Sequence, residues 1–180
     1  MTGEAKTHYE VIVVGAGVAG IYQIKRLVDL GIDATVLEAA ADLGGTWYWN
    51  RYPGCRFDSE SYTYGFSFSR ELLDEWHWKE RFSGQPENLR YLNYVADKFD
   101  LRRHMQFGCK VEVMRFDEAR DLWQLTLSGG RTLTSRFVVL GIGLLSAPTM
   151  PRLGQPSSWW GMSSCPWPSW WIWTGCRPGP

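Results

Sequence analysis

The sequence has no excess of charge of either sign and no long apolar stretch. Its 180 residues carry 19 basic and 19 acidic side chains, so the formal net charge is zero. Without a basic stripe, we expect no nucleic-acid partner. There is no run of about eighteen apolar residues that could span a membrane, and the polar residues 1–8 contain no apolar core of a secretory signal. We therefore expect a cytoplasmic protein with no membrane partner.

The cysteines are also few and unpaired in sequence, which argues against two kinds of chemistry. Cys55, Cys109, Cys165 and Cys176 form no close pair and have no histidine beside them. Zinc sites need closely spaced cysteine or histidine ligands, so no metal site is predicted. A redox-active disulfide of the flavin disulfide reductase kind is not expected either, because it needs two cysteines close together in the chain.

Near its start the chain contains the pattern of a strand, a glycine turn and a helix. The apolar run 9–14 leads into Gly15, Gly17 and Gly20. In dinucleotide-binding βαβ units the first glycine permits the tight turn, the second lets the backbone approach a pyrophosphate, and the third lets helix and strand pack closely. The phosphates would lie at the N-terminus of the helix, where N–H groups and the helix dipole attract an anion.

A helix, a second strand and an acid follow at the spacing that such a unit requires. Apolar residues at helical spacing predict a helix over residues 18–30, ended by Gly31, and residues 34–37 form a short buried strand. Glu38 stands at the end of that strand, eighteen residues after Gly20. Its carboxylate can accept hydrogen bonds from a ribose and would repel a 2′-phosphate, so we expect FAD or NAD there rather than NADP. A glycine turn in an unrelated α/β unit is the alternative.

The rest of residues 8–153 reads as a continuation of the same domain. Two helices are predicted, one over residues 72–79 that carries Trp76 and Trp78, and one that begins at Pro86. Short strands are predicted at residues 105–107, 110–116, 122–127, 131–134 and 137–140. The middle three form a small antiparallel meander, whereas the last has the continuous apolar character of a strand in a buried parallel sheet.

The final region, residues 154–180, has a different character. Six tryptophans and five prolines lie between residues 155 and 180, and Arg177 is the one charged residue there. The tryptophans follow neither helical nor strand periodicity, and the prolines break any amphipathic helix. We interpret this region as a disordered or out-of-frame tail, typical of translation in a wrong reading frame. Genuine structure and contact with a membrane are the alternatives.

A resemblance to a known family is carried first by residues 44–58. The type I Baeyer–Villiger monooxygenases, which contain FAD and depend on NADPH, have a flavin loop similar to residues 44–58, Gly-Gly-Thr-Trp-Tyr-Trp-Asn-Arg-Tyr-Pro-Gly-Cys-Arg-Phe-Asp. Further matches lie at residues 76–80, 85–87 and 95–101, and the family's linker between its FAD and NADPH domains resembles residues 141–148. The resemblance covers about residues 8–153 and rests on several motifs in the same order.

This resemblance implies a fold and an activity. The fold is α/β: a Rossmann-like, FAD-binding ββα three-layer domain with a small antiparallel β-meander. Residues 8–153 would be the N-terminal, and therefore incomplete, part of the family's FAD-binding domain. In the family, NADPH reduces the flavin, the flavin reacts with O2, and a ketone becomes an ester or a lactone. The complete enzyme would thus use FAD, NADPH, O2 and a small-molecule ketone.

The resemblance also implies site residues. The cofactor-binding residues carried over by position are Gly15, Gly17, Gly20, Glu38, Gly45, Thr46, Trp47, Trp49, Asp58, Tyr64 and Val111. In the family, Asp58 would lie near the flavin and position a catalytic arginine. Trp47 and Trp49 are alternatively packing aromatics, and Asp58 a solvated loop acid or helix cap. Arg51 and Arg56 are interpreted as surface or ion-pairing residues.

Several features of the family are missing. The signature Phe-x-Gly-x-x-x-His-x-x-x-Trp-Pro is expected shortly after Pro151, where the tryptophan-rich region begins instead. A second glycine fingerprint for NADPH and a candidate for the catalytic arginine are also absent. We therefore expect an interruption after about Leu153 and no activity of this chain; a heteroatom-oxidising flavin monooxygenase and a non-catalytic remnant are the alternatives. The unfinished sheet should also expose apolar surface and lower the solubility.

Overall fold

The computed structural model describes residues 6–146 of the chain. The tryptophan-rich region 154–180 lies outside the described residues, as does the end of the predicted domain 8–153. The first three elements are β1 (His8–Val14), α1 (Val18–Asp29) and β2 (Ala34–Leu37). They confirm the predicted strand, helix and strand, and Glu38 follows β2 directly.

Among the described residues, six strands form one mixed sheet in the order β3-β2-β1-β6-β5-β4. β3 (Met105–Gln106), β2, β1 and β6 (Thr132–Leu140) run parallel to one another. β4 (Val111–Asp117) and β5 (Leu122–Leu127) continue the sheet as an antiparallel hairpin beside β6. The predicted α/β class with an antiparallel meander is thereby confirmed.

Two of the predicted strands form a single strand. Residues 131–134 and 137–140 were expected to be separate, yet β6 runs through both. Its first residues pair antiparallel with β5, with Thr132 opposite Thr126, while its later residues pair parallel with β1. The separation is therefore wrong, because no glycine or proline interrupts residues 132–140 and the extended backbone simply continues.

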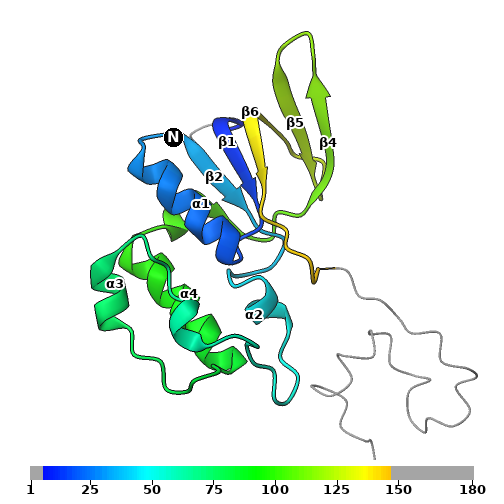
Figure 1. Cartoon of the computed structure of the whole chain (residues 1–180). Coiled ribbons are helices and arrows are strands. Elements are labelled where there is room, and N and C mark those ends of the chain that lie inside the picture. The colour runs from blue at the N-terminus through cyan, green and yellow to red at the C-terminus, as the bar shows by residue number, and fades with distance from the viewer. Residues whose placement is uncertain (1–5, 147–180) are drawn as a thin grey trace, which may run out of the picture.

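Alternate residues of β1 point to opposite faces of the sheet, and apolar residues are buried on both faces. Val11 and Val13 pack with Ile24 and other residues of α1, which crosses one face of the sheet (Figure 1). Ile12 belongs to a second cluster on the opposite face. Its other buried members are Leu37, Leu125, Leu127 and Leu133. The sheet thus buries one face against α1 and the other among apolar side chains of its own strands β1, β2, β5 and β6.

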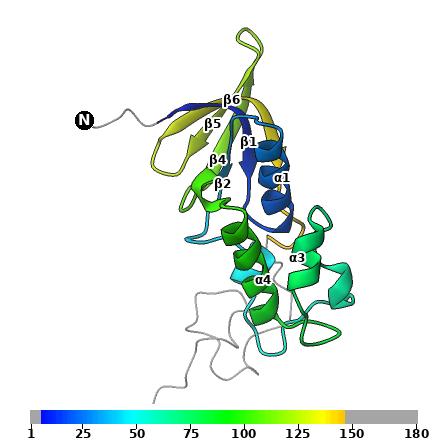
Figure 2. The ribbon, with the colours of Figure 1, turned by 90° about the vertical axis from the view of Figure 1, so that its left-hand side faces the viewer.

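The helical part of the chain lies beyond the ends towards which the parallel strands run (Figures 1 and 2). It comprises α2 (Thr46–Trp49), α3 (Arg70–Glu75) and α4 (Gln85–Lys98), with a short 3₁₀ turn at Ser61–Thr63; a second 3₁₀ turn, Arg102–His104, lies beside β2 and leads into β3. α4 begins as predicted, with Pro86 in its first turn, where the missing N–H costs no hydrogen bond. Its residues Leu92 and Ala96 are fully buried.

The predicted helix over residues 72–79 is wrong at both ends. α3 begins one residue after Ser69, whose side chain caps the helix, and it ends before Trp76. Trp76 and Trp78 instead pack against Tyr91 of α4, with ring centroids 5.1 and 4.9 Å from the tyrosine ring. These aromatic contacts favour an extended backbone after Glu75, which local helical spacing could not reveal.

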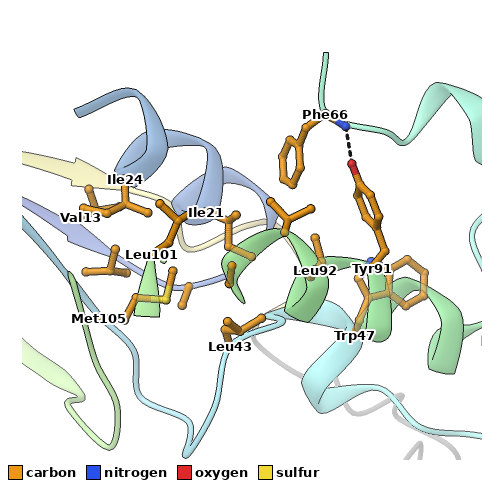
Figure 3. Packing of buried hydrophobic residues seen from close by; sticks show 14 of the residues in the cluster. Val13, Ile21, Ile24, Leu43, Trp47, Phe66, Tyr91, Leu92, Leu101 and Met105 are labelled. Carbon is orange, nitrogen blue, oxygen red and sulfur yellow. Dashed lines mark hydrogen bonds between the residues drawn. The ribbon is translucent and has the colours of Figure 1, made fainter. Parts of the chain in front are cut away.

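The sheet and the helical part share one apolar core (Figure 3). Leu43, Trp47 and Leu92 from the helical part lie in the same cluster as the apolar residues of α1. Tyr91 is buried among them, and its Oη accepts a hydrogen bond from the backbone N–H of Phe66 at 2.7 Å. The loops and helices around residue 47 are therefore held rigidly against the strand–turn–helix unit.

Membrane-spanning and metal-binding features are lacking across residues 6–146. No helix there combines the length and the apolarity needed to cross a bilayer. No group of three or more His, Cys, Asp or Glu side chains in this range is arranged to hold a metal ion. Cys55 and Cys109, the cysteines in this range, are free thiols.

Candidate nucleotide-binding site

The turn between β1 and α1 requires glycine at residue 15 in the turn and at residue 20 in the first turn of α1. Gly15 has a φ of +100°, and a Cβ atom there would lie 2.7 Å from the carbonyl oxygen of Gly141. A Cβ atom on Gly20 would lie 1.8 Å from the carbonyl oxygen of Gly15. Gly15 N also donates a hydrogen bond to Leu37 O at 2.8 Å. These two glycines therefore let the turn pack against β2 and the end of β6.

The N-terminus of α1 is open to an anion. Gly17 is the N-cap residue, and the first turn has neither a side-chain cap nor an acidic residue. Among the described residues, no hydrogen bond engages the backbone N–H groups of Gly17, Val18 or Ala19. Unpaired N–H groups at a helix N-terminus, together with the helix dipole, form the usual binding site for a phosphate.

A second glycine pair packs directly on this turn. Gly44 N donates a hydrogen bond to Ala16 O at 3.0 Å. Gly45 has a φ of +52°, and a Cβ atom there would lie 2.8 Å from the Cα atom of Gly17. Gly17 and Gly45, which are distant in sequence, thus form one glycine-lined surface at the start of α1. Sequence reasoning missed Gly44, although the Gly-Gly doublet itself was a signal.

Glu38 is buried at the same place and ties two turns together. Its side chain is only 5% exposed. Oε2 accepts a hydrogen bond from Ala16 N at 2.6 Å, and Oε1 accepts one from Ala40 N at 2.8 Å. A carboxylate offers about four lone-pair positions, so each oxygen can accept a further hydrogen bond from a ribose hydroxyl. The residue therefore has a structural role, and its contact with a ribose stays a prediction.

Trp47 points into the core, where it contacts Tyr64. Its side chain is 5% exposed, and Nε1 donates a hydrogen bond to Tyr64 Oη at 2.6 Å. The rings of Phe57 and Tyr64 lie edge-on to it, with centroids 6.2 and 6.1 Å away. Burial raises the pKa of Tyr64, although the hydrogen bond from Trp47 acts in the opposite direction. This is the packing arrangement that the sequence left open as an alternative for Trp47.

The remaining predicted residues lie further from the glycine surface or in solvent. Thr46 and Trp49 are exposed on α2, immediately after Gly45. Asp58 is exposed, and no hydrogen bond within residues 6–146 engages its side chain. Val111 begins β4 and packs against the second core cluster. Contact of these four residues with a cofactor stays a prediction.

Gln85 is a further residue that sequence reasoning missed. It is the first residue of α4 and is 8% exposed. Its side-chain Nε2 donates to Trp47 O, and its backbone N donates to Cys55 O at 2.8 Å. Gln85 therefore joins α4 to α2 and to the loop before Asp58, and the family resemblance at residues 85–87 was the available signal.

Comparison with known proteins gives these features a context. The family of NAD(P)-binding Rossmann-like domains matches residues 13–76. Acetone monooxygenase (methyl acetate-forming) of Gordonia sp. is 45% identical over 142 residues, which is 79% of this chain and 27% of that protein. A Baeyer–Villiger monooxygenase of Pseudooceanicola batsensis is 43% identical over 145 residues, covering 80% and 27%. Phenazine N-monooxygenase PhzNO1 of Lysobacter antibioticus is 40% identical over 154 residues, covering 85% and 28%.

A solved structure agrees with these relatives. The complex of OTEMO with FAD and NADP superimposes with a TM-score of 0.77 at 44% sequence identity, over 83% of this chain and 28% of that one. This chain thus spans less than a third of the length of the proteins that it matches. In sequence and in fold, the chain belongs to the Baeyer–Villiger monooxygenase family of flavin-dependent enzymes.

Proposed function

We propose that residues 8–153 are the FAD-binding part of a flavin-dependent monooxygenase that converts ketones to esters or lactones with NADPH and O2. One observation carries this proposal: Gly17, Gly45 and the carboxylate of Glu38 meet at the uncapped N-terminus of α1. The relatives support the cofactor and the substrate class, because an acetone monooxygenase and a complex with FAD and NADP are among them.

The residues at this surface fit a dinucleotide of the FAD type. The absence of Cβ atoms at Gly17 and Gly45 lets a ligand approach the backbone closely. The N–H groups of the first turn of α1 can donate to a pyrophosphate, and the free lone pairs of Glu38 can accept from ribose hydroxyls. The negative charge of Glu38 disfavours a 2′-phosphate here, so NADPH would bind elsewhere.

Bound FAD would supply the electron transfer and the activation of O2, whereas this chain's residues would bind and orient it. The glycine surface would hold the pyrophosphate, and Glu38 would orient the ribose. Asp58 is exposed and would be available to an arginine outside residues 6–146. Thr46, Trp49, Tyr64 and Val111 are proposed to line the cofactor further along.

Oxidation of nitrogen or sulfur is the second candidate function. It is favoured by the 40% identity to a phenazine N-monooxygenase. The proposed site concerns the cofactor and includes no substrate-binding residue, so it fits both reactions. A non-catalytic remnant, the alternative that the sequence left open, is the third candidate. A cytoplasmic location and the ketone substrate both stay predictions.

Titration of the purified chain with FAD tests the proposal. We expect quenching of flavin fluorescence on binding, and no oxidation of NADPH with either a ketone or a thioether. Glu112, an exposed glutamate on β4, provides the matched control. Glu38→Gln should weaken FAD binding while Glu112→Gln should not. A folded chain that fails to bind FAD would contradict the proposal, and NADPH oxidation would contradict the expected loss of activity.

A further inference from the structure

Arg102 lies away from the glycine surface, yet its whole guanidinium group is used to connect two parts of the chain. Nε donates to Asp97 Oδ1 at 2.6 Å, and Nη1 donates to Asp42 Oδ1 at 2.7 Å. Nη2 donates to Asn93 Oδ1. Asn93 and Asp97 lie one turn apart on α4, whereas Asp42 lies in the loop after β2. Arg102 therefore fastens this loop to α4.

A continuous series of contacts leads from Asp42 to the start of α1. Asp42 Oδ1 also accepts a hydrogen bond from the backbone N–H of Leu43 at 2.8 Å. The side chain of Leu43 is fully buried in the core (Figure 3). The next residue, Gly44, donates to Ala16 O, and Gly45 packs on Gly17 as described above. The loop at residues 42–45 is thus held at both of its ends.

α4 touches the same loop at a second point. A Cβ atom on Gly44 would lie 2.5 Å from Leu89 Cδ1, so the apolar contact there is already tight. Asn93 Nδ2 donates to the carbonyl oxygen of Leu89 at 2.8 Å. Because Asn93 also accepts the hydrogen bond from Arg102, it links Arg102 to the residue that makes the apolar contact. α4 thus contacts the loop through Leu89 and is hydrogen-bonded to it through Arg102.

We propose that Arg102 is a positioning residue that holds residues 42–45 against the glycine turn and so sets the affinity for the dinucleotide. The part that concerns affinity rests on the proposed function; the part that concerns the loop does not. A guanidinium is suited to this role because its planar fork can satisfy three acceptors in fixed directions. Arg102 does not contact the glycine surface, so its effect passes through Asp42.

The neighbouring Arg103 is a matched control. It carries the same charge, but its side chain is 63% exposed and its salt bridge is to Asp100 at 3.2 Å, three residues away. Arg102 is 35% exposed and bridges residues distant in sequence. Arg102→Met and Arg103→Met therefore remove the same charge and differ in the link to the loop.

Amide hydrogen exchange in the ligand-free chain tests the link. Arg102→Met should speed the exchange of the Gly44 amide by about tenfold, because a charge-assisted hydrogen bond that restrains the loop is lost. The Leu125 amide in β5 should keep its rate, and Arg103→Met should change neither. An unchanged rate at Gly44 would overturn the proposal. Equal acceleration at Gly44 and Leu125 would also overturn it, since that result would indicate general destabilisation.

The affinity for FAD is measured separately. Arg102→Met should raise the dissociation constant about tenfold and Arg103→Met should leave it unchanged. Combining Arg102→Met with Asp42→Asn should weaken binding no further than Arg102→Met alone, because both substitutions remove the same link. An unchanged dissociation constant in Arg102→Met, or additive effects, would overturn the proposal. If the wild-type chain binds no FAD, the proposed function fails, and the exchange at Gly44 still decides the role of Arg102.

Discussion

The carboxylate of Glu38 accepts a hydrogen bond from the backbone N–H of Ala16 at 2.6 Å, which joins the end of β2 to the glycine turn after β1. The acid expected to bind a ribose is thus also part of the framework of the site. Its second oxygen holds Ala40, at the start of the loop that leads to Gly44 and Gly45. Because one side chain arranges both glycine segments, we expect stability and cofactor binding to depend on the same residue.

Replacing Glu38 with glutamine should therefore lower both stability and FAD affinity. A glutamine amide can accept from one of the two N–H groups, and its NH2 group would face the other. A buried N–H left without an acceptor costs about 1–3 kcal/mol, which urea denaturation should detect. The exposed Glu112→Gln variant should unfold at the wild-type urea concentration. An unchanged midpoint in Glu38→Gln would contradict the framework role.

Alanine substitutions at Gly17 and Gly20 should separate binding from folding. A Cβ atom on Gly17 would lie 3.5 Å from Gly45 Cα, an ordinary contact, and Gly17 has a φ of −80° that alanine adopts readily. Gly17→Ala should therefore fold but lose FAD binding, because the methyl group would fill the space in which the pyrophosphate is expected to bind. Circular dichroism and FAD titration measure the two effects.

Gly20→Ala should instead prevent correct folding. Its Cβ atom would lie 1.8 Å from Gly15 O, so the helix would have to move away from the turn. We expect a loss of stability of at least about 3 kcal/mol, the upper range for overpacking. A Gly20→Ala protein with wild-type thermal stability would show that the turn is more adaptable than its geometry indicates.

Tyr91 should make stability depend on alkaline pH. Burial raises its pKa from 10.0 to about 12. The unfolded chain loses this proton above about pH 10 while the folded chain keeps it, so the stabilisation is complete below pH 10 and is lost as the pH rises through about 12. Urea denaturation at several pH values should show a smaller dependence on pH in Tyr91→Phe than in the wild type. If both proteins lose the same stability as the pH rises from 10 to about 12, the assignment to Tyr91 is wrong.

Exposed apolar residues in the last part of β6 and just after it should limit the solubility of the chain. Phe137, Leu140 and Ile142 are 51%, 53% and 55% exposed and lie close together in sequence. Replacing all three with threonine should reduce the binding of an apolar fluorescent dye and raise solubility. Leu30→Thr, at a single exposed leucine after α1, is the control and should leave dye binding unchanged. Equal dye binding by the triple variant would place the exposed apolar patch elsewhere.

Errors of prediction occurred where partners distant in sequence decide the local structure. Trp76 and Trp78 fitted a helical pattern, but their contacts with Tyr91 favour an extended backbone. Residues 131–134 and 137–140 were predicted as two strands, but β6 runs through both and pairs with β5 along one edge and with β1 along the other. Periodicity describes which side of an element is buried, and it contains no information on which partner buries it.

The sequence by itself determined the strand–turn–helix unit and the strand that ends at Glu38, because glycine, β-branched residues and helical spacing act over short distances. The family followed from the resemblance of residues 44–58 and of the motifs after them to known proteins. Only the tertiary structure decided that Gly45 packs on Gly17, that Trp47 faces Tyr64 in the core, and that Glu38 accepts hydrogen bonds from two turns. Apart from the hydrogen bond from Ala40 to Glu38, these contacts join residues at least 17 positions apart. Their geometry depends on how the whole core packs, which no local pattern specifies.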